Sequence, residues 1–277
     1  KLLVAALDTA IALAQMDDIA VMVRQDLKFD VARAFDVFFD INVTPAEIGF
    51  RLGLGHLERI DERHVIMADA HAFASASGSS FYYAFLFLPK PRRAAITAFY
   101  AFCREVDDVV DETEDAQLAA TKLAWWRVEV AGLFAGNPQH PVTRALQPVL
   151  APYGITARRL NEIIDGMEMD LTQTRYLDFA GLERYCYHVA GVVGLLAAGI
   201  FGHTDPRTLE YAKNLGTAFQ LTNIIRDVGE DARKNRIYLP VEDLQKFSVT
   251  AADLLNARHS EAFVALMRFQ TARARAY

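Results

Sequence analysis

Apolar residues recur every three or four positions along most of the chain, with polar and charged residues between them. This period places the apolar side chains on one face of an α-helix, whereas the strict alternation of a half-buried strand is scarce. Proline and glycine separate one helical stretch from the next. The pattern predicts an all-α fold with helices at about residues 2–26, 29–40, 45–53, 58–76, 79–87, 91–112, 116–135, 141–152, 156–172, 179–202, 206–231 and 250–273.

An acidic motif lies at the end of the helix predicted at 91–112. Asp107 and Asp111 are four positions apart and share one face, with Arg104 and Tyr100 one and two turns earlier. Like charges at this spacing repel, and no lysine within the motif neutralises them. Two interpretations follow: a solvated acidic helix end, or a Mg²⁺ site, because Mg²⁺ binds one or two carboxylates together with water and phosphate oxygens.

A second polar stripe lies on the helix predicted at 206–231. Its side chains all carry oxygen ligands, and steps of three, four and four positions place them along one face: Gln220, Asn223, Asp227 and Asp231. Aliphatic residues fill the positions between them, so a purely structural helix has little reason to carry this stripe. Two such helices facing each other would form a cage of carboxylates for two or three Mg²⁺ ions.

A basic turn follows the second stripe. It contains Arg233, Lys234 and Arg236 and continues through Tyr238 to Pro240. Arginine and lysine side chains in a turn are suited to bind a diphosphate. The two acidic motifs and the basic turn together favour a metal-dependent site for a diphosphate over a pair of solvated surface helices.

The composition narrows the possible partners. The 277 residues are 52% hydrophobic, and 29 basic against 35 acidic residues give a net charge of −6. This balance argues against a nucleic acid partner, which requires clustered lysine and arginine. It leaves an anionic small substrate open, because bound cations invert the local charge. Cys103 and Cys186 lie within apolar helical patterns and are expected to be reduced core residues.

Several blocks of the chain resemble the squalene/phytoene synthase family. Within it, the SGSSFYYAF and AWWR (124–127) forms favour the bacterial presqualene diphosphate synthases of hopanoid biosynthesis over phytoene synthase. The blocks are SGSSFYYAFLFLP (77–89), YAFCREVDDVVDE (100–112), DGMEMDL (165–171), YCYHVAGVVGLLAAGIFG (185–202) and FQLTNIIRDVGEDARKNRIYLP (219–240).

The resemblance implies roles for individual residues. It implies two Mg²⁺-binding sets, which are Asp107, Asp108 and Asp111, and Asn223, Asp227 and Asp231. It implies a tyrosine near the reacting carbons, Tyr185, and a tunnel for the prenyl chain bordered by Val193, Gly194 and Leu196. The implied substrate contacts are Ser80, Phe81, Tyr100, Arg104, Gln220, Arg226, Lys234, Arg236 and Tyr238.

The resemblance also implies the reaction. Two farnesyl diphosphates would be joined head to head to presqualene diphosphate plus pyrophosphate, with two or three Mg²⁺ ions and without NAD(P)H. Water must be excluded from the cation, and aromatic residues at 81–87 are candidates for the lining, although core packing is favoured for Phe85 and Phe87. The alternatives are a phytoene synthase acting on geranylgeranyl diphosphate and a non-catalytic assembly or scaffold protein on the same fold. The intact aspartates argue against a scaffold, and the lack of a nicotinamide fingerprint argues against squalene synthase.

The chain ends differ from what the resemblance implies. Residues 1–68 match no part of the family and are interpreted as a helical N-terminal extension. Residues 69–277 form the prenyl synthase domain, which is expected to be truncated because the family continues for several more helices. The longest apolar run, Val189 to Phe201, is 13 residues, too short to cross a bilayer. A cytoplasmic protein is expected, and the apolar substrate leaves peripheral association with the inner membrane face open.

Overall fold

The computed structural model describes residues 85, 87–113 and 115–277. This part of the chain is helical, with a single isolated parallel bridge between Arg175 and Ile237, and the all-α prediction is confirmed. The helices are α7 (Lys90–Asp111), α8 (Ala116–Phe134), α9 (Pro141–Leu146), α10 (Leu150–Tyr153), α11 (Ala157–Thr172), α12 (Phe179–Cys186), α13 (Val192–Phe201), α14 (Arg207–Arg233), α15 (Val241–Lys246), α16 (Ala251–Leu255) and α17 (Glu261–Ala276).

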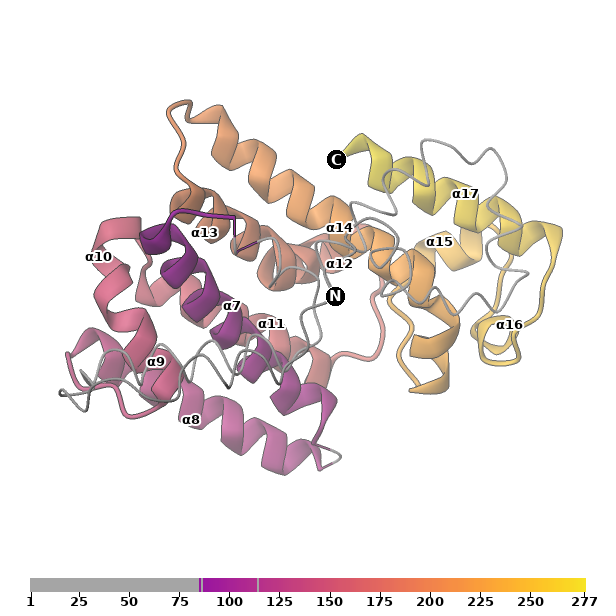
Figure 1. Cartoon of the computed structure of the whole chain (residues 1–277). Helices are drawn as coiled ribbons and strands as arrows, with labels where there is room; N and C mark the ends of the chain where they lie inside the picture. Colours follow the sequence, from indigo (N-terminus) through magenta and orange to yellow (C-terminus); the bar gives the residue numbers. More distant parts are fainter. Residues whose placement is uncertain (1–84, 86, 114) are drawn as a thin grey trace, which may run out of the picture.

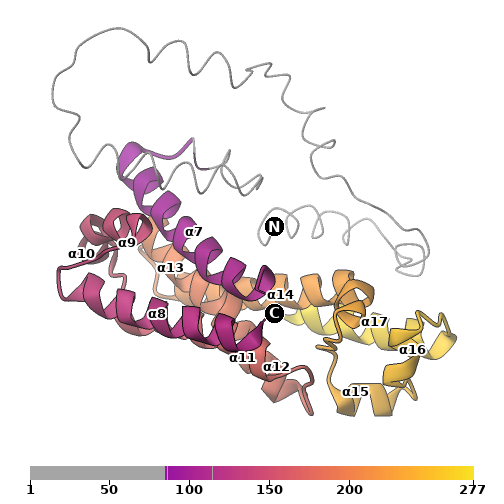
Figure 2. The same ribbon diagram turned by 90° about the horizontal axis from the view of Figure 1, so that it is seen from below.

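The longest helix, α14, connects two groups of helices (Figures 1 and 2). On one side it packs against α13, next to α7, α8 and α11. On the other side it contacts α16 and α17. Fully buried aromatic and aliphatic side chains of α7, α8 and α11 form much of the core, among them Phe99, Phe102, Leu123, Leu160 and Ile163. The C-terminal end of α7 lies near the turn after α14, where Arg236 forms an ion pair with Asp111.

Two features near the C-terminus differ from the predicted helices. The helix predicted at 250–273 is divided into α16 and α17, because Ala257 takes a positive φ of 49° and Ser260 caps a new helix by accepting a hydrogen bond from the Phe263 amide. The short helix α15 was not predicted at all. The predicted helices before residue 79 and the N-terminal extension lie outside the described residues.

The helix predicted at 179–202 is confirmed, and it contains the apolar run Val189 to Phe201. A π-helical turn, Tyr187–Gly191, joins α12 to α13 without a break, so the helix runs from Phe179 to Phe201. At 23 residues and a mean hydropathy of 1.3, it is long and apolar enough to cross a membrane by length and composition, unlike the predicted run of 13. In the bundle 56% of its most apolar window is buried, which is the environment of a core helix.

Glycines allow this helix to lie very close to α14. A Cβ atom added to Gly194 would lie 2.3 Å from the carbonyl oxygen of Ala212, and one added to Gly216 would lie 2.4 Å from that of Ala190. No side chain fits at either position without moving backbone. The side-chain direction of Gly194 therefore faces the backbone of α14, and its place at the border of the tunnel stays a prediction.

Candidate active site

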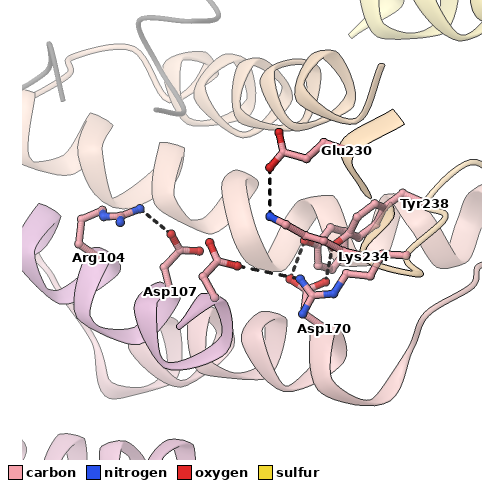
Figure 3. A network of polar contacts seen from close by, with 9 residues as sticks. Arg104, Asp107, Asp170, Glu230, Lys234 and Tyr238 are labelled. Atoms are coloured by element: carbon pink, nitrogen blue, oxygen red, sulfur yellow. Dashed lines mark hydrogen bonds and ion pairs between the residues drawn. The ribbon is translucent and has the colours of Figure 1, made fainter. Parts of the chain in front are cut away.

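The carboxylates of α7 are held by arginines. Arg104 donates from Nη1 to Asp107 Oδ2 at 2.7 Å (Figure 3). It also donates from Nη2 to Asp108 Oδ1 at 2.5 Å. Asp111 lies one turn further on and forms a 4.0 Å ion pair with Arg236. The motif contains no lysine, and Arg104, which the sequence places one turn earlier on the same face, neutralises part of its charge.

The polar stripe of α14 combines one ion pair with two unpartnered oxygens. Arg226 binds Asp227 through two hydrogen bonds, each 2.7 Å long. The side-chain oxygens Gln220 Oε1 and Asn223 Oδ1 are buried, and neither has a hydrogen-bond partner among the described residues. A buried acceptor without a donor is costly, about 1–3 kcal/mol. These oxygens are therefore suited to a ligand that supplies positive charge or a proton donor.

Two aspartates, one on each helix, have strongly raised pKa values. The pKa of Asp107 is raised to about 7, first by burial and then by the negative charge of Asp111, against the lowering effect of Arg104. The pKa of Asp231 is also raised to about 7, by burial and then by the charges of Asp227 and Glu230. The charged forms of both carboxyls are thus unfavourable until a further cation balances them.

The basic turn links the two acidic helices. Arg236 reaches Asp111 on α7, while Lys234 forms a 3.1 Å ion pair with Glu230 on α14. The positive φ of Asn235, 60°, turns the chain sharply between these two cations. The turn thereby places two cations suited to bind a diphosphate at the end of both motifs (Figure 3). The sequence predicted the basic turn itself but not its ion pairs with Asp111 and Glu230.

A carboxylate that the sequence analysis did not select lies beside this turn. Asp170 stands near the end of α11 and accepts hydrogen bonds from the hydroxyls of Tyr185 and Tyr238, both 2.8 Å long. The only available signal was its place in the DGMEMDL block, where it has no acidic partner at helical spacing that would suggest chemistry. Tertiary structure alone brings it to the two tyrosines.

Only some of the remaining candidates for substrate contact or pocket lining lie among the described residues. Tyr100 lies on α7, half-buried, with its ring in an edge-to-face contact with Phe85 at 5.9 Å. Phe85 is buried, as expected for core packing, whereas Phe87 is 78% exposed and is neither core nor lining in the described part of the chain. Ser80 and Phe81, expected to contact substrate, lie outside the described residues.

The residues fit magnesium that arrives with a diphosphate. Within the part of the chain that the structure describes, no three His, Cys, Asp or Glu side chains converge on one point, and the aspartates turn toward arginines instead. Mg²⁺ needs few protein ligands when phosphate oxygens and waters complete its octahedron. The unpartnered Asn223 oxygen and the mutually repelling carboxyls of each helix supply such a sparse set of ligands.

We expect Asp231→Asn to stabilise the metal-free protein at a pH near 8 and to flatten its pH dependence. The folded pKa of about 7 exceeds the usual aspartate value of about 3.9, so the folded protein binds more protons between these values. Its contribution to stability is present at low pH and is lost as the pH rises through about 7. Thermal unfolding of both proteins in a chelator, at about pH 5 and about pH 8, tests this. At about pH 8 the midpoint of Asp231→Asn should lie a few degrees above that of the wild type.

The matched control is Glu210→Gln, at an exposed position in the first turn of α14. It should leave both unfolding midpoints and their difference unchanged. If the unfolding midpoint of Asp231→Asn depends on pH as steeply as that of the wild type, the Asp231 charge is already balanced in the metal-free fold.

The two aspartate-bearing helices of this bundle meet at one basic turn. The chain belongs to the squalene/phytoene synthase family, whose model matches residues 74–277. The predicted family is therefore confirmed.

Individual relatives agree with this assignment. A phytoene synthase of Arthrospira platensis is 40% identical over 72% of this chain and 68% of its own length. A presqualene diphosphate synthase of Rhodopseudomonas palustris is 43% identical over 64% of each protein. In both alignments this chain thus spans about two thirds of the relative's length.

Solved structures share the fold. A squalene synthase from Alicyclobacillus acidocaldarius superimposes with a TM-score of 0.72 at 29% identity, covering 78% of this chain and 81% of that one. A dehydrosqualene synthase in complex with a ligand gives a TM-score of 0.71 at 32% identity, covering 78% of this chain and 75% of that one.

Proposed function

We propose that this protein joins two farnesyl diphosphates head to head and forms presqualene diphosphate and pyrophosphate. The observation that carries the proposal is the meeting of α7 and α14 at the basic turn, where Arg236 reaches Asp111 across the two helices. A presqualene diphosphate synthase that is 43% identical in the aligned region supports the choice of farnesyl diphosphate and of this product.

The residues suggest how the departing diphosphate is held. When bound, Mg²⁺ supplies positive charge to the phosphate oxygens. Asp107 and Asp111 on α7, with Asn223, Asp227 and Asp231 on α14, are the oxygen ligands that would hold the ions. Lys234 and Arg236 would contact the diphosphate directly, because their cations are directed toward the same end of the two helices.

The chemistry then follows from the loss of pyrophosphate. Breaking the bond between C1 and oxygen in the first farnesyl diphosphate leaves an allylic cation. The double bond of the second molecule attacks C1, and loss of a proton closes the cyclopropane ring. The released pyrophosphate can accept that proton, so Tyr185 contributes next to the reacting carbons without having to act as the base. Buried apolar side chains must keep water from the cation.

The product identifies the function. The full chain is incubated with farnesyl diphosphate and Mg²⁺ without NADPH, and the lipid product is identified by mass spectrometry. We expect presqualene diphosphate and an equimolar amount of pyrophosphate. A parallel reaction without Mg²⁺, in a chelator, should give no product. The absence of a coupled product from both farnesyl and geranylgeranyl diphosphate would contradict the proposal.

A second candidate is phytoene synthase, which would couple two geranylgeranyl diphosphates. The supporting observation is that phytoene synthases match more of this chain, 72% against 64% for the presqualene diphosphate synthase. The same experiment with geranylgeranyl diphosphate separates the two, since the preferred substrate is the one with the larger kcat/KM. Phytoene from the longer substrate, with no coupling of farnesyl diphosphate, would favour this candidate.

A further inference from the structure

Asp170 uses both of its carboxylate oxygens on tyrosine hydroxyls. Tyr185 donates to Oδ2 and Tyr238 donates to Oδ1, and each bond is 2.8 Å long. The two rings stack at 5.3 Å with an angle of 26° between their planes. Both tyrosines are buried, with 3% and 8% of their surface exposed. Such a set of buried, mutually bonded groups holds one geometry firmly.

Two segments that are distant in the sequence bring these groups together. The Ile237 amide donates to the Thr174 carbonyl oxygen at 3.1 Å, and the Val241 amide donates to that of Tyr176 at 2.9 Å. The segment after α11 therefore runs beside the segment after α14, which carries Tyr238. Figure 3 shows the hydrogen bond between Tyr238 and Asp170, with the ion pair of Lys234 and Glu230 close by.

The direction of the hydrogen bonds determines what the tyrosines can offer. A carboxylate is an acceptor only, so both hydroxyl hydrogens must be directed toward Asp170. The lone pairs of the two phenol oxygens then lie on the sides that face away from Asp170. Without the carboxylate, each hydroxyl could rotate and direct its hydrogen elsewhere. Burial raises the pKa of Asp170, while the hydrogen bonds from Tyr238 and Tyr185 and the charge of Arg236 act in the opposite direction and favour its ionised form.

We propose that Asp170 is a positioning residue that directs the Tyr185 and Tyr238 hydroxyl hydrogens inward, so that their oxygens offer electron density to the allylic cation. The inference rests on the proposed function, because it requires a cation next to Tyr185. It assigns a task to Asp170, a residue of α11 that belongs to neither acidic motif. A phenol oxygen held in this orientation stabilises positive charge, whereas a freely rotating hydroxyl does so only part of the time.

The kinetic test is a mutant cycle in the full chain. Asp170→Asn should lower kcat by about 10- to 100-fold, because the tyrosine hydroxyls are no longer held in one orientation. It should change KM less than twofold. Tyr185→Phe should cause a similar loss. If Asp170 acts through the two tyrosines, adding Asp170→Asn to a Tyr185→Phe/Tyr238→Phe variant should cause no further loss of kcat. Losses that multiply would overturn the inference.

The matched control is Tyr176→Phe. Tyr176 stacks on Tyr238 at 6.0 Å in the same ring cluster, but its buried hydroxyl has no hydrogen-bond partner among the described residues. Removing this hydroxyl should leave kcat and the unfolding midpoint unchanged or raise the midpoint. A loss of kcat equal to that of Asp170→Asn would mean that any disturbance of the ring cluster impairs the enzyme, and would overturn a specific role for Asp170.

A spectroscopic readout separates this inference from the proposed function. In protein labelled with ¹³C at tyrosine Cζ, Asp170→Asn should shift the Tyr185 and Tyr238 signals and leave the Tyr176 signal in place. A wild-type protein that couples no prenyl diphosphate contradicts the proposed function, whatever the spectrum shows. An active wild-type protein whose Tyr185 signal does not move in Asp170→Asn contradicts the positioning role alone.

Discussion

Asp227→Asn is expected to abolish coupling of prenyl diphosphates, with a loss of at least about a hundredfold in kcat, while the fold remains intact. Asp227 stands at the centre of the α14 stripe, where its carboxylate is paired with Arg226. Asparagine keeps the shape and one oxygen but loses the charge that a divalent cation requires. Product formation at saturating Mg²⁺ and the unfolding midpoint are measured on the same preparation.

The outcome distinguishes a catalytic from a structural aspartate. Asp107→Asn, the equivalent change on α7, should cause a similar loss, whereas the exposed control Glu210→Gln should turn over like the wild type. If Asp227→Asn unfolds the protein, the carboxylate is needed for the fold. If turnover is retained, the ions are held by other groups and the proposed cage is incorrect.

Gly194→Ala is expected to destabilise the protein strongly, although alanine normally favours a helix over glycine by about 1 kcal/mol. The added methyl would lie 2.3 Å from the Ala212 carbonyl oxygen, so α13 and α14 would have to separate. Overpacking of this kind costs about 1–3 kcal/mol. The unfolding midpoint should fall by several degrees, about 2–4 °C for each kcal/mol in a chain of this size.

Gly229→Ala is the matched control for this substitution. Gly229 is also inside a helix, but a Cβ there would meet only the Arg233 side chain, at 3.8 Å. We expect its midpoint to stay the same or to rise. A Gly194→Ala protein as stable as the wild type would show that α13 and α14 can move apart freely, and the close backbone approach would then have no role in stability.

The helical period explains why so much of the site could be predicted. Residues three or four positions apart share a face in any α-helix, so the stripes of α7 and α14 follow from spacing alone. Asp107 and Asp111, and Gln220 to Asp231, occupy the helices expected for them. The residues that bind Mg²⁺ or substrate remain predictions, since the variants above are what test them.

Contacts across the bundle could not be predicted in this way. Asp170 has no acidic neighbour at helical spacing, and Tyr238 follows it by 68 positions, yet one hydrogen bond joins them. The helix predicted at 250–273 is divided because Ser260 caps a new N-terminus, which the apolar period around it does not reveal. The close approach of Gly194 to the Ala212 carbonyl likewise follows only from the packing of α13 against α14.

The sequence by itself determined the all-α class and the two acidic stripes, because both depend on a repeat of 3.6 residues that each segment carries without help from the rest of the chain. The tertiary structure alone decided the contacts between distant segments: Arg236 with Asp111, and Asp170 with two tyrosines. The physical reason is distance. Ion pairs and hydrogen bonds act over a few ångströms, and the packing of α7, α11 and α14 sets those distances for residues that are far apart in the chain.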